Sequence, residues 1–296
     1  MSQSFLDRLR SGEILVSDGA TGTNLQARGL MRGMASEQWV LDNPEAIVRL
    51  HRDFIEAGSN IVLTSTFGGT ALRLEHNDLH VRAAEINRRA VELARQASGG
   101  RPVLVAGSMG PTGHLLEPLG PLTRGDAVKA YADQARWLAE GGADLLLIET
   151  QFDLAEAAAA VEGARLVTRL PLICSFSFDM GRHTMMGVQP AQVAREFTAL
   201  DVDVIGVNCG RSLDENLEAL KAMRTATDKP IWMKPNAGLP RMGDDDAAIY
   251  DVTPAMMGEA AIQWRAVGAQ VIGGCCGTTP EHLRAIARTA QAARVA

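Results

Sequence analysis

Short runs of mainly apolar residues recur along the chain, and small or polar residues close most of them. Each run is nearly continuous in hydrophobicity, which is typical of strands in a parallel sheet covered on both faces. Eight runs are present, at residues 14–19, 61–68, 103–110, 145–151, 171–178, 204–210, 231–238 and 271–277. The pattern therefore predicts eight buried strands.

Helical patterns fill the stretches between these runs, for example at residues 44–58, 81–97 and 125–143. Four prolines stand where a helix could begin, because proline's missing N–H costs nothing in the first turn; they are Pro44, Pro190, Pro254 and Pro280. Alternating strands and helices predict an α/β fold, a (β/α)8 TIM barrel forming a single domain over residues 1–296. A doubly wound open sheet is the alternative, but the even spacing and the count of eight favour the barrel.

Composition narrows the class of protein. Hydrophobic residues make up 46% of the chain and charged residues 22%, as in ordinary globular proteins. The net charge of −6 argues against nucleic acid or an anionic membrane as a partner. The amino terminus has no signal-peptide run, and no apolar stretch reaches the length of a spanning helix. We therefore expect a cytoplasmic protein whose four cysteines are thiols or metal ligands.

Three of the four cysteines fall at strand ends. In a (β/α)8 barrel the working residues lie at the carboxyl ends of the strands and in the loops that follow. Cys209 closes the sixth run, and Cys275 and Cys276 close the eighth. These two strands flank the seventh, so their ends can approach each other across its mouth. Cys174 lies inside the fifth run and is interpreted as a small core residue.

Three thiols at one rim suit a catalytic zinc ion, which takes three protein ligands and keeps a fourth position open. Metal coordination deprotonates a thiol, and three thiolates on one cation leave a fourth, incoming thiolate electron-rich. A helix predicted to start after Gly277 would further favour the thiolates of Cys275 and Cys276. The pattern indicates a site that activates a sulfur nucleophile. Coincidental burial of the adjacent cysteines and a vicinal disulfide are the alternatives.

Seven motifs, spread over nearly the whole chain, resemble those of the homocysteine S-methyltransferases. They are DGATGT (18–23), GSNIVLTSTFGGT (58–70), GSMGPTG (107–113), IET (148–150), GVNCG (206–210), KPNAG (234–238) and GGCCGTTPEH (273–282). The resemblance implies a (β/α)8 barrel whose zinc is held by Cys209, Cys275 and Cys276. It also implies that homocysteine binds zinc as a thiolate and is methylated to methionine.

By the same resemblance, Asp18, Gly19, Thr64 and Glu149 line the homocysteine pocket. Their chemistry agrees, because carboxylates at strand ends suit an ammonium group. Backbone N–H groups around Gly19 and the Thr64 hydroxyl suit a carboxylate. Asn236 is expected near the zinc, where it would take the open position in the absence of substrate. For Asp18 the alternative is a turn residue of the first loop.

The methyl donor is less clearly indicated. Members of the family use methylcobalamin on a separate domain, or onium compounds such as glycine betaine and S-methylmethionine. The segments LTSTFGGT and KPNAG most resemble the homocysteine module of cobalamin-dependent methionine synthase. Betaine-using animal members carry aromatic residues at the positions of Gly68 and Thr150. A methylated corrinoid on a separate protein is therefore the expected donor.

An onium donor is the alternative, and it calls for an aromatic cage. Phe67, Phe152, Trp232 and Tyr250 are candidates, although barrel packing is the favoured interpretation of Trp232. The loop at 238–252, acidic at its middle, is predicted to be a mobile lid or a docking surface.

Two other classes of protein compete with a methyltransferase. One is a non-catalytic zinc-binding or thiol-sensing protein on a barrel scaffold. The other is a Schiff-base enzyme using Lys234, which is disfavoured because no activating cation adjoins that lysine in sequence.

Overall fold

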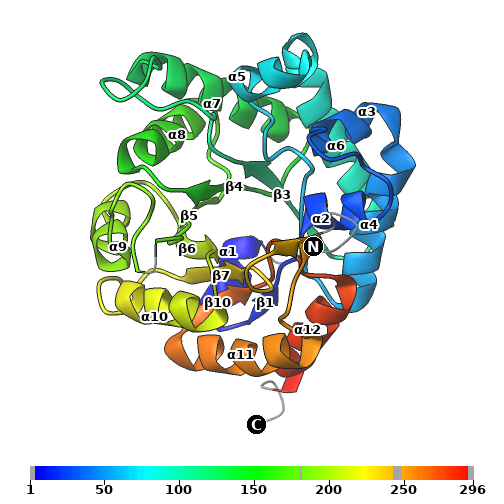
Figure 1. Cartoon of the computed structure of the whole chain (residues 1–296), viewed down its shortest axis with the longest axis vertical. Coiled ribbons are helices and arrows are strands. Elements are labelled where there is room, and N and C mark those ends of the chain that lie inside the picture. The colour runs from blue at the N-terminus through cyan, green and yellow to red at the C-terminus, as the bar shows by residue number, and fades with distance from the viewer. Residues whose placement is uncertain (1–3, 181, 243–247, 293–296) are drawn as a thin grey trace.

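The predicted runs form a barrel of parallel strands surrounded by helices (Figure 1). The computed structural model describes residues 4–180, 182–242 and 248–292. Within them the barrel strands are β1 (Leu15–Val16), β2 (Ile61–Leu63), β3 (Leu104–Met109), β4 (Leu145–Gln151), β5 (Leu172–Phe176), β6 (Val204–Cys209), β7 (Ile231–Pro235) and β10 (Ala269–Ile272).

Parallel pairing closes the ring of strands. Neighbouring strands are hydrogen-bonded in the order β1-β10-β7-β6-β5-β4-β3-β2. A parallel bridge between Ser17 and Ile61 joins the first strand to the second and completes the barrel. The predicted (β/α)8 TIM barrel is confirmed, and an open doubly wound sheet is excluded.

Each strand begins within two residues of its predicted run, but several end earlier. β2 stops at Leu63, whereas its run extends to residue 68. Beyond that point the chain bonds within its own loop, as when the Thr66 N–H donates to the Thr64 carbonyl at 2.9 Å. The carboxyl ends of the runs are therefore loops, and these loops carry the candidate site residues.

Among the described residues, eight helices of nine or more residues pack around the outside of the barrel. They are α4 (Pro44–Ala57), α6 (Ala83–Ser98), α7 (Arg124–Glu140), α8 (Leu154–Val167), α9 (Pro190–Thr198), α10 (Leu213–Arg224), α11 (Pro254–Val267) and α12 (Pro280–Ala292). Four of them begin at the four predicted prolines. In the described ranges, no helix combines the length and the hydropathy needed to cross a bilayer.

Short elements occupy the connections. Four helices are α1 (Phe5–Arg10), α2 (Thr21–Gln26), α3 (Trp39–Asp42) and α5 (Ala71–Leu74). Three 3-10 turns are η1 (Ser36–Gln38), η2 (Glu75–Asn77) and η3 (His80–Arg82). An antiparallel hairpin, β8 (Arg241–Met242) with β9 (Ala248–Ile249), follows β7. The acidic middle of the predicted 238–252 lid falls at residues 243–247, which lie outside the described residues.

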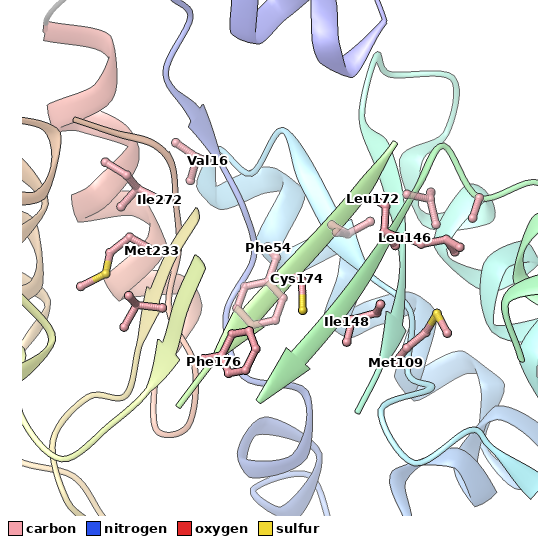
Figure 2. Packing of buried hydrophobic residues seen from close by; sticks show 14 of the residues in the cluster. Val16, Phe54, Met109, Leu146, Ile148, Leu172, Cys174, Phe176, Met233 and Ile272 are labelled. Atoms are coloured by element: carbon pink, nitrogen blue, oxygen red, sulfur yellow. The ribbon is translucent and has the colours of Figure 1, made fainter. Parts of the chain in front are cut away.

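Apolar side chains form two main layers of core. One cluster fills the barrel interior and includes Trp232, which agrees with the packing interpretation of that residue. Phe5 and Leu9 of α1 pack into the same interior from the end where β1 begins. A larger cluster lies between the strands and the helices, where Phe176 and the fully buried Cys174 pack (Figure 2). Cys174 is thus a core residue, as predicted.

One polar side chain is buried in this outer core without a partner. His51 of α4 is 1% exposed, and neither ring nitrogen has a hydrogen-bond partner among the described residues. Burial lowers the pKa of His51 to about 4, from 6.5 in water. Because the folded state binds the proton less readily than the unfolded state, the protonation of His51 costs no stability above pH 6.5. Its cost grows as the pH falls from 6.5 towards 4.

We predict that His51→Leu removes part of the acid sensitivity of the fold. The pKa shift of His51 corresponds to about 3 kcal/mol of unfolding free energy once the pH is below 4. Urea unfolding at pH 7 and pH 4.5 should show a smaller loss of stability for the variant than for the parent. His80→Leu, at an exposed position, is the control. Equal acid losses for parent and His51→Leu would contradict the prediction.

Candidate metal and substrate site

Three cysteines from two strand ends meet at one rim of the barrel. The Sγ atoms of Cys209 and Cys275 are 3.3 Å apart, and all three sulfurs, with that of Cys276, lie within 4.8 Å of one another. Backbone bonds to the end of β7 fix this approach. The Cys275 N–H donates to the Pro235 carbonyl at 2.7 Å, and the Asn236 N–H donates to the Cys209 carbonyl at 3.0 Å. The meeting across the seventh strand is as predicted.

The cluster fits a thiophilic divalent cation. Sulfurs bound to a tetrahedral zinc at about 2.3 Å lie roughly 3.8 Å apart, which is close to the observed spacing. Hydrogen bonds from Cys209 and Cys275 hold the pKa of Cys276 well below its usual value. The hydrogen bond to Cys275 is the main reason that the pKa of Cys209 is raised. The site readily holds one thiolate, and a cation would allow the other two thiols to ionise.

Asn208, buried at the end of β6, organises the loop that carries Cys209. Its Nδ2 donates to Thr150 Oγ1 at 2.7 Å and to Cys209 Sγ at 3.4 Å. Its Oδ1 accepts from the Thr150 N–H at 3.0 Å and from Ser175 Oγ at 2.6 Å. Thr150 and Cys209 both adopt left-handed backbone, with φ of 58° and 57°. Such conformations cost energy and persist only where neighbours hold them, so Asn208 is a clamp on the site.

The predicted residue Asn236 also lies between the cysteine loops. Its Oδ1 accepts from the Cys276 N–H at 3.0 Å, and its Nδ2 donates to the Gly210 carbonyl at 2.9 Å. The amide oxygen and the amide nitrogen of Asn236 therefore join the loop after β10 to the loop after β6. Ligation of a metal by Asn236 stays a prediction.

Tyr250 covers the far side of the Cys276 loop. Gly277 has a φ of +78°, and a Cβ at this position would collide with the Tyr250 ring. Glycine is thus required both for the backbone conformation and for the close approach of the ring. Burial raises the pKa of Tyr250 to about 12, and the negative charge of the three neighbouring cysteines adds to the effect.

A cavity of about 410 Å³ opens above the three sulfurs. Gly19, Thr64 and Glu149 line it together with the cysteines, as predicted for a shared pocket. Two predicted residues do not line the cavity: Asp18 is buried behind its wall, and Asn236 lies between the cysteine loops. The cavity is also lined by Phe67, a candidate for the onium cage, by Lys234, the Schiff-base alternative, and by Ser108 and Thr150, for which the sequence predicts no role.

Two buried carboxylates lie close to the cavity floor. Asp18 Oδ2 accepts from the Leu63 N–H at 2.7 Å, and Glu149 Oε1 accepts from Ser108 Oγ at 2.5 Å. Burial raises the pKa of Asp18 and of Glu149 to about 7, although the Lys234 charge opposes the shift in each. A cationic group entering the cavity would favour the ionised forms of both. The arrangement suits an ammonium group.

Lys234 is the basic residue of this site. Burial opposes its charge, but Asp18, Cys275 and Glu149 outweigh burial and raise the pKa of Lys234. Its ammonium group donates to backbone carbonyls and lies 3.6 Å from Asp18 Oδ1. A lysine held charged in this way is not poised as a Schiff-base nucleophile.

The hydroxyl and backbone groups expected to receive a carboxylate are partly engaged. Thr64 Oγ1 accepts from the Ser108 N–H at 3.0 Å and is 2.6 Å from Thr66 Oγ1. The Ala20 N–H donates to Thr278 Oγ1 at 3.1 Å, so it is not free for a ligand. The Gly19 and Thr64 segments still form the cavity wall opposite the thiols.

The aromatic cage considered for an onium donor is not assembled from its four candidates. Phe67 lines the cavity and is 38% exposed. Trp232 lies inside the barrel core, and Phe152 and Tyr250 are not among the residues that line the cavity. A single aromatic face is therefore available at the mouth.

Comparisons with known proteins agree with this site. The homocysteine S-methyltransferase family model matches residues 15–290. The methionine synthase of Mycobacterium tuberculosis is 34% identical over 294 residues, and that of Mycobacterium leprae is 32% identical over 291 residues. These matches cover 94% and 93% of this chain but 24% of each relative, so the chain spans about a quarter of their length.

A solved structure is similar over its full length. The homocysteine methyltransferase MmuM from Escherichia coli, in its metallated form, superposes with a TM-score of 0.79 and 27% sequence identity. The match covers 95% of this chain and 98% of that one. Together with the three thiols and the adjoining cavity, the comparisons indicate thiol chemistry at this rim.

We predict that Cys209→Ser abolishes metal binding. The loss of affinity should exceed the roughly 10–100-fold effect of removing a partner that only supports a ligand. Metal content after dialysis against a weak chelator, measured by elemental analysis, tests this. Cys174→Ala is the control, because Cys174 lies in the core away from the cluster and its variant should keep the parent's metal content. A Cys209→Ser protein that retains metal would show that the cluster is not the ligand set.

We further predict that Asn208→Ala lowers metal affinity by about 10–100-fold, since it removes the N–H bond to Cys209 Sγ and the clamp on Thr150. Competition with a chromophoric chelator measures the change. Asn87→Ala provides the control, because Asn87 is buried and bonded to the Gly69 and Ala83 carbonyls. The control should lose stability without losing metal affinity. If both variants bind metal as the parent does, Asn208 only supports the fold.

Proposed function

Because the chain belongs to the homocysteine S-methyltransferase family, we propose that it binds homocysteine as a zinc thiolate and methylates it to methionine. One observation carries this function: the three thiols of Cys209, Cys275 and Cys276 converge beneath a cavity that Glu149 also lines. Sulfur ligands without a histidine suit an ion that must activate another sulfur. A cytoplasmic location, where thiols stay reduced, forms part of the same proposal.

The thiol end of the substrate would meet the cysteine cluster. Zinc held by Cys209, Cys275 and Cys276 supplies an open coordination position and favours the thiolate form of the substrate at neutral pH. The protein's own contribution is to hold that sulfur in one place. The bonds of Asn208 and Asn236 keep the cysteine loops fixed, which is the pre-organisation that such a step needs.

The amino-acid end of the substrate would lie across the cavity. Glu149, with Asp18 behind it, would accept the ammonium group, and the wall at Gly19 and Thr64 would face the carboxylate. The substrate sulfur would then point its lone pair at the methyl carbon of the donor. A new sulfur–carbon bond forms as the methyl group's old bond breaks, and the electrons of that bond leave with the donor.

We propose a methylated corrinoid, carried by a separate protein or module, as the donor. Exposed apolar side chains occur on the connections that follow barrel strands, including the β8–β9 hairpin; they are Met31, Leu115, Leu119, Met180, Met185, Leu239, Met242 and Ile249. An apolar, methionine-rich rim suits a large partner that must bring its methyl group to the mouth. The methionine synthases that match here are about four times the length of the matched segment, which is compatible with such a partner.

A small onium donor is the second candidate. Phe67 favours it, because its half-exposed ring lies on the cavity wall and an aromatic face attracts an onium group. A lone ring binds such a cation less tightly than a cage, so we rank this candidate below the corrinoid.

The decisive experiment is methionine formation by the zinc-loaded protein from homocysteine and one donor at a time. The donors are methylcobalamin, S-methylmethionine, glycine betaine and dimethylsulfoniopropionate. We expect turnover with methylcobalamin and little or none with any onium compound, since a lone ring contributes only about 1 kcal/mol, or roughly fivefold in affinity. Cys209→Ser is the inactive control.

Each other outcome is informative. Turnover with an onium donor alone would replace the corrinoid by the second candidate. In that case Phe67→Leu should raise the KM for the donor and leave the KM for homocysteine unchanged. Zinc binding without methyl transfer from any donor would favour a thiol-sensing protein instead of an enzyme.

A further inference from the structure

One buried lysine connects the two halves of the candidate site, which are the thiol cluster and the pair of buried carboxylates. Lys234 is 2% exposed and lies at the end of β7, between the carboxylates and the thiols. Among the described residues that line the cavity, it is the only one with a basic side chain. Its Nζ is 2.6 Å from the Gly274 carbonyl oxygen, 3.3 Å from that of Gly19 and 3.6 Å from Asp18 Oδ1.

The two carbonyl contacts are hydrogen bonds, and the contact with Asp18 is an ion pair, since 3.6 Å is too long for a hydrogen bond. The ammonium group thus spends two of its three N–H donors on backbone carbonyls and lies beside the Asp18 carboxylate. All of these partners are groups of the site itself, so Lys234 acts on a substrate through the groups that it holds.

The groups that Lys234 holds adjoin the key residues of both halves. The Gly274 carbonyl belongs to the peptide unit that leads into Cys275. The Gly19 carbonyl lies in the next peptide unit after Asp18, and Lys234 approaches the Asp18 carboxylate directly. One ammonium group thus joins the loop after β1 to the loop after β10. Other hydrogen bonds also join these loops, from the Gly274 N–H to the Asp18 carbonyl at 3.2 Å and from the Ala20 N–H to Thr278 Oγ1 at 3.1 Å. Lys234 adds the contact that reaches the Asp18 carboxylate.

On the basis of the function proposed above, we propose that Lys234 is a positioning residue that sets the distance between the ammonium-binding carboxylates and the thiol cluster, and thereby selects homocysteine over cysteine. The two amino acids carry the same charged groups and differ by one methylene between the α-carbon and the sulfur. When the carboxylates and the thiol cluster are held at a fixed distance, a substrate side chain of only one length reaches both. A site free to adjust would accept either thiol.

Cysteine makes the test specific, because it shares the ammonium, the carboxylate and the thiol of homocysteine. Loss of the lysine charge alone would change the affinity for both thiols by a similar factor. Loss of the fixed distance would change the ratio of the two affinities. A lysine that only stabilises the barrel would alter neither the ratio nor the metal content.

The experiment compares Lys234→Met with the parent and with Lys229→Met. Lys229 lies just before β7, and its Nζ donates to the Val202 carbonyl at 2.6 Å, so its loss removes a comparable lysine away from the site. Calorimetric titration of the zinc-loaded proteins with L-homocysteine and with L-cysteine gives the affinity ratio. Zinc content and thermal unfolding are measured on the same samples.

We expect the parent and Lys229→Met to bind homocysteine at least about tenfold more tightly than cysteine, the discrimination that one methylene allows. Lys234→Met should keep its zinc and bind homocysteine about tenfold or more weakly than the parent, with a ratio close to one. A Lys234→Met protein with the parent's ratio would overturn the assignment, even if its unfolding temperature falls. Lys234→Gln, whose amide keeps two N–H donors without the charge, replaces the methionine variant if that one does not fold.

The parent alone also tests the assignment. A parent that methylates homocysteine but binds cysteine equally well would exclude a role for Lys234 in selection, while leaving the proposed function intact. A zinc-loaded parent that binds neither thiol would instead refute the proposed function, and with it the selection that depends on it.

Discussion

The candidate site depends on one constraint, the pairing of β6 and β10 with opposite edges of β7. Parallel pairing brings the carboxyl ends of these strands to the same rim, so residues 66 positions apart in sequence come into contact. The backbone bonds from Cys275 to Pro235 and from Asn236 to Cys209 extend the pairing past the last ladder bonds. The thiols are therefore placed by the sheet itself, and a mobile loop is not needed to bring them together.

Charge is the second constraint, because the same rim holds two buried carboxylates, one buried ammonium group and three half-buried thiols. Without compensation, this many acidic groups would resist ionising together. Lys234 offsets part of that repulsion from within the wall. A divalent cation among the thiols and an ammonium group beside Glu149 would offset the rest. The unbalanced charge of the site is thus itself a reason to expect a cation at each end of the cavity.

The sequence predicts the barrel and the cysteine cluster well for the same reason: both follow from strand order. Buried apolar runs locate the strands, and a polar residue closing a run then lies on a known rim. The roles of Lys234 and Asn208 escape this procedure, although both lie at strand ends, because the partners that define those roles come from other parts of the chain. Asp18 shows a related limit. Its position at a strand end is predicted, but its location behind the cavity wall depends on the bond to Leu63, which no local pattern reveals.

The buried site residues and the exposed connections around them differ in character, and this difference bears on how the proposed donor could reach the site. The acceptor end consists of buried groups joined by short hydrogen bonds, among them Glu149, Asn208 and Lys234. The connections that follow the barrel strands carry exposed side chains such as Met31, Met180 and Met242. Under the proposed function, the rigid buried groups would fix the sulfur of the substrate, while flexible methionine side chains could adapt to partners of different shape. Such a division would let the exposed residues be fitted to one donor or another while the buried groups that hold the thiol stay the same.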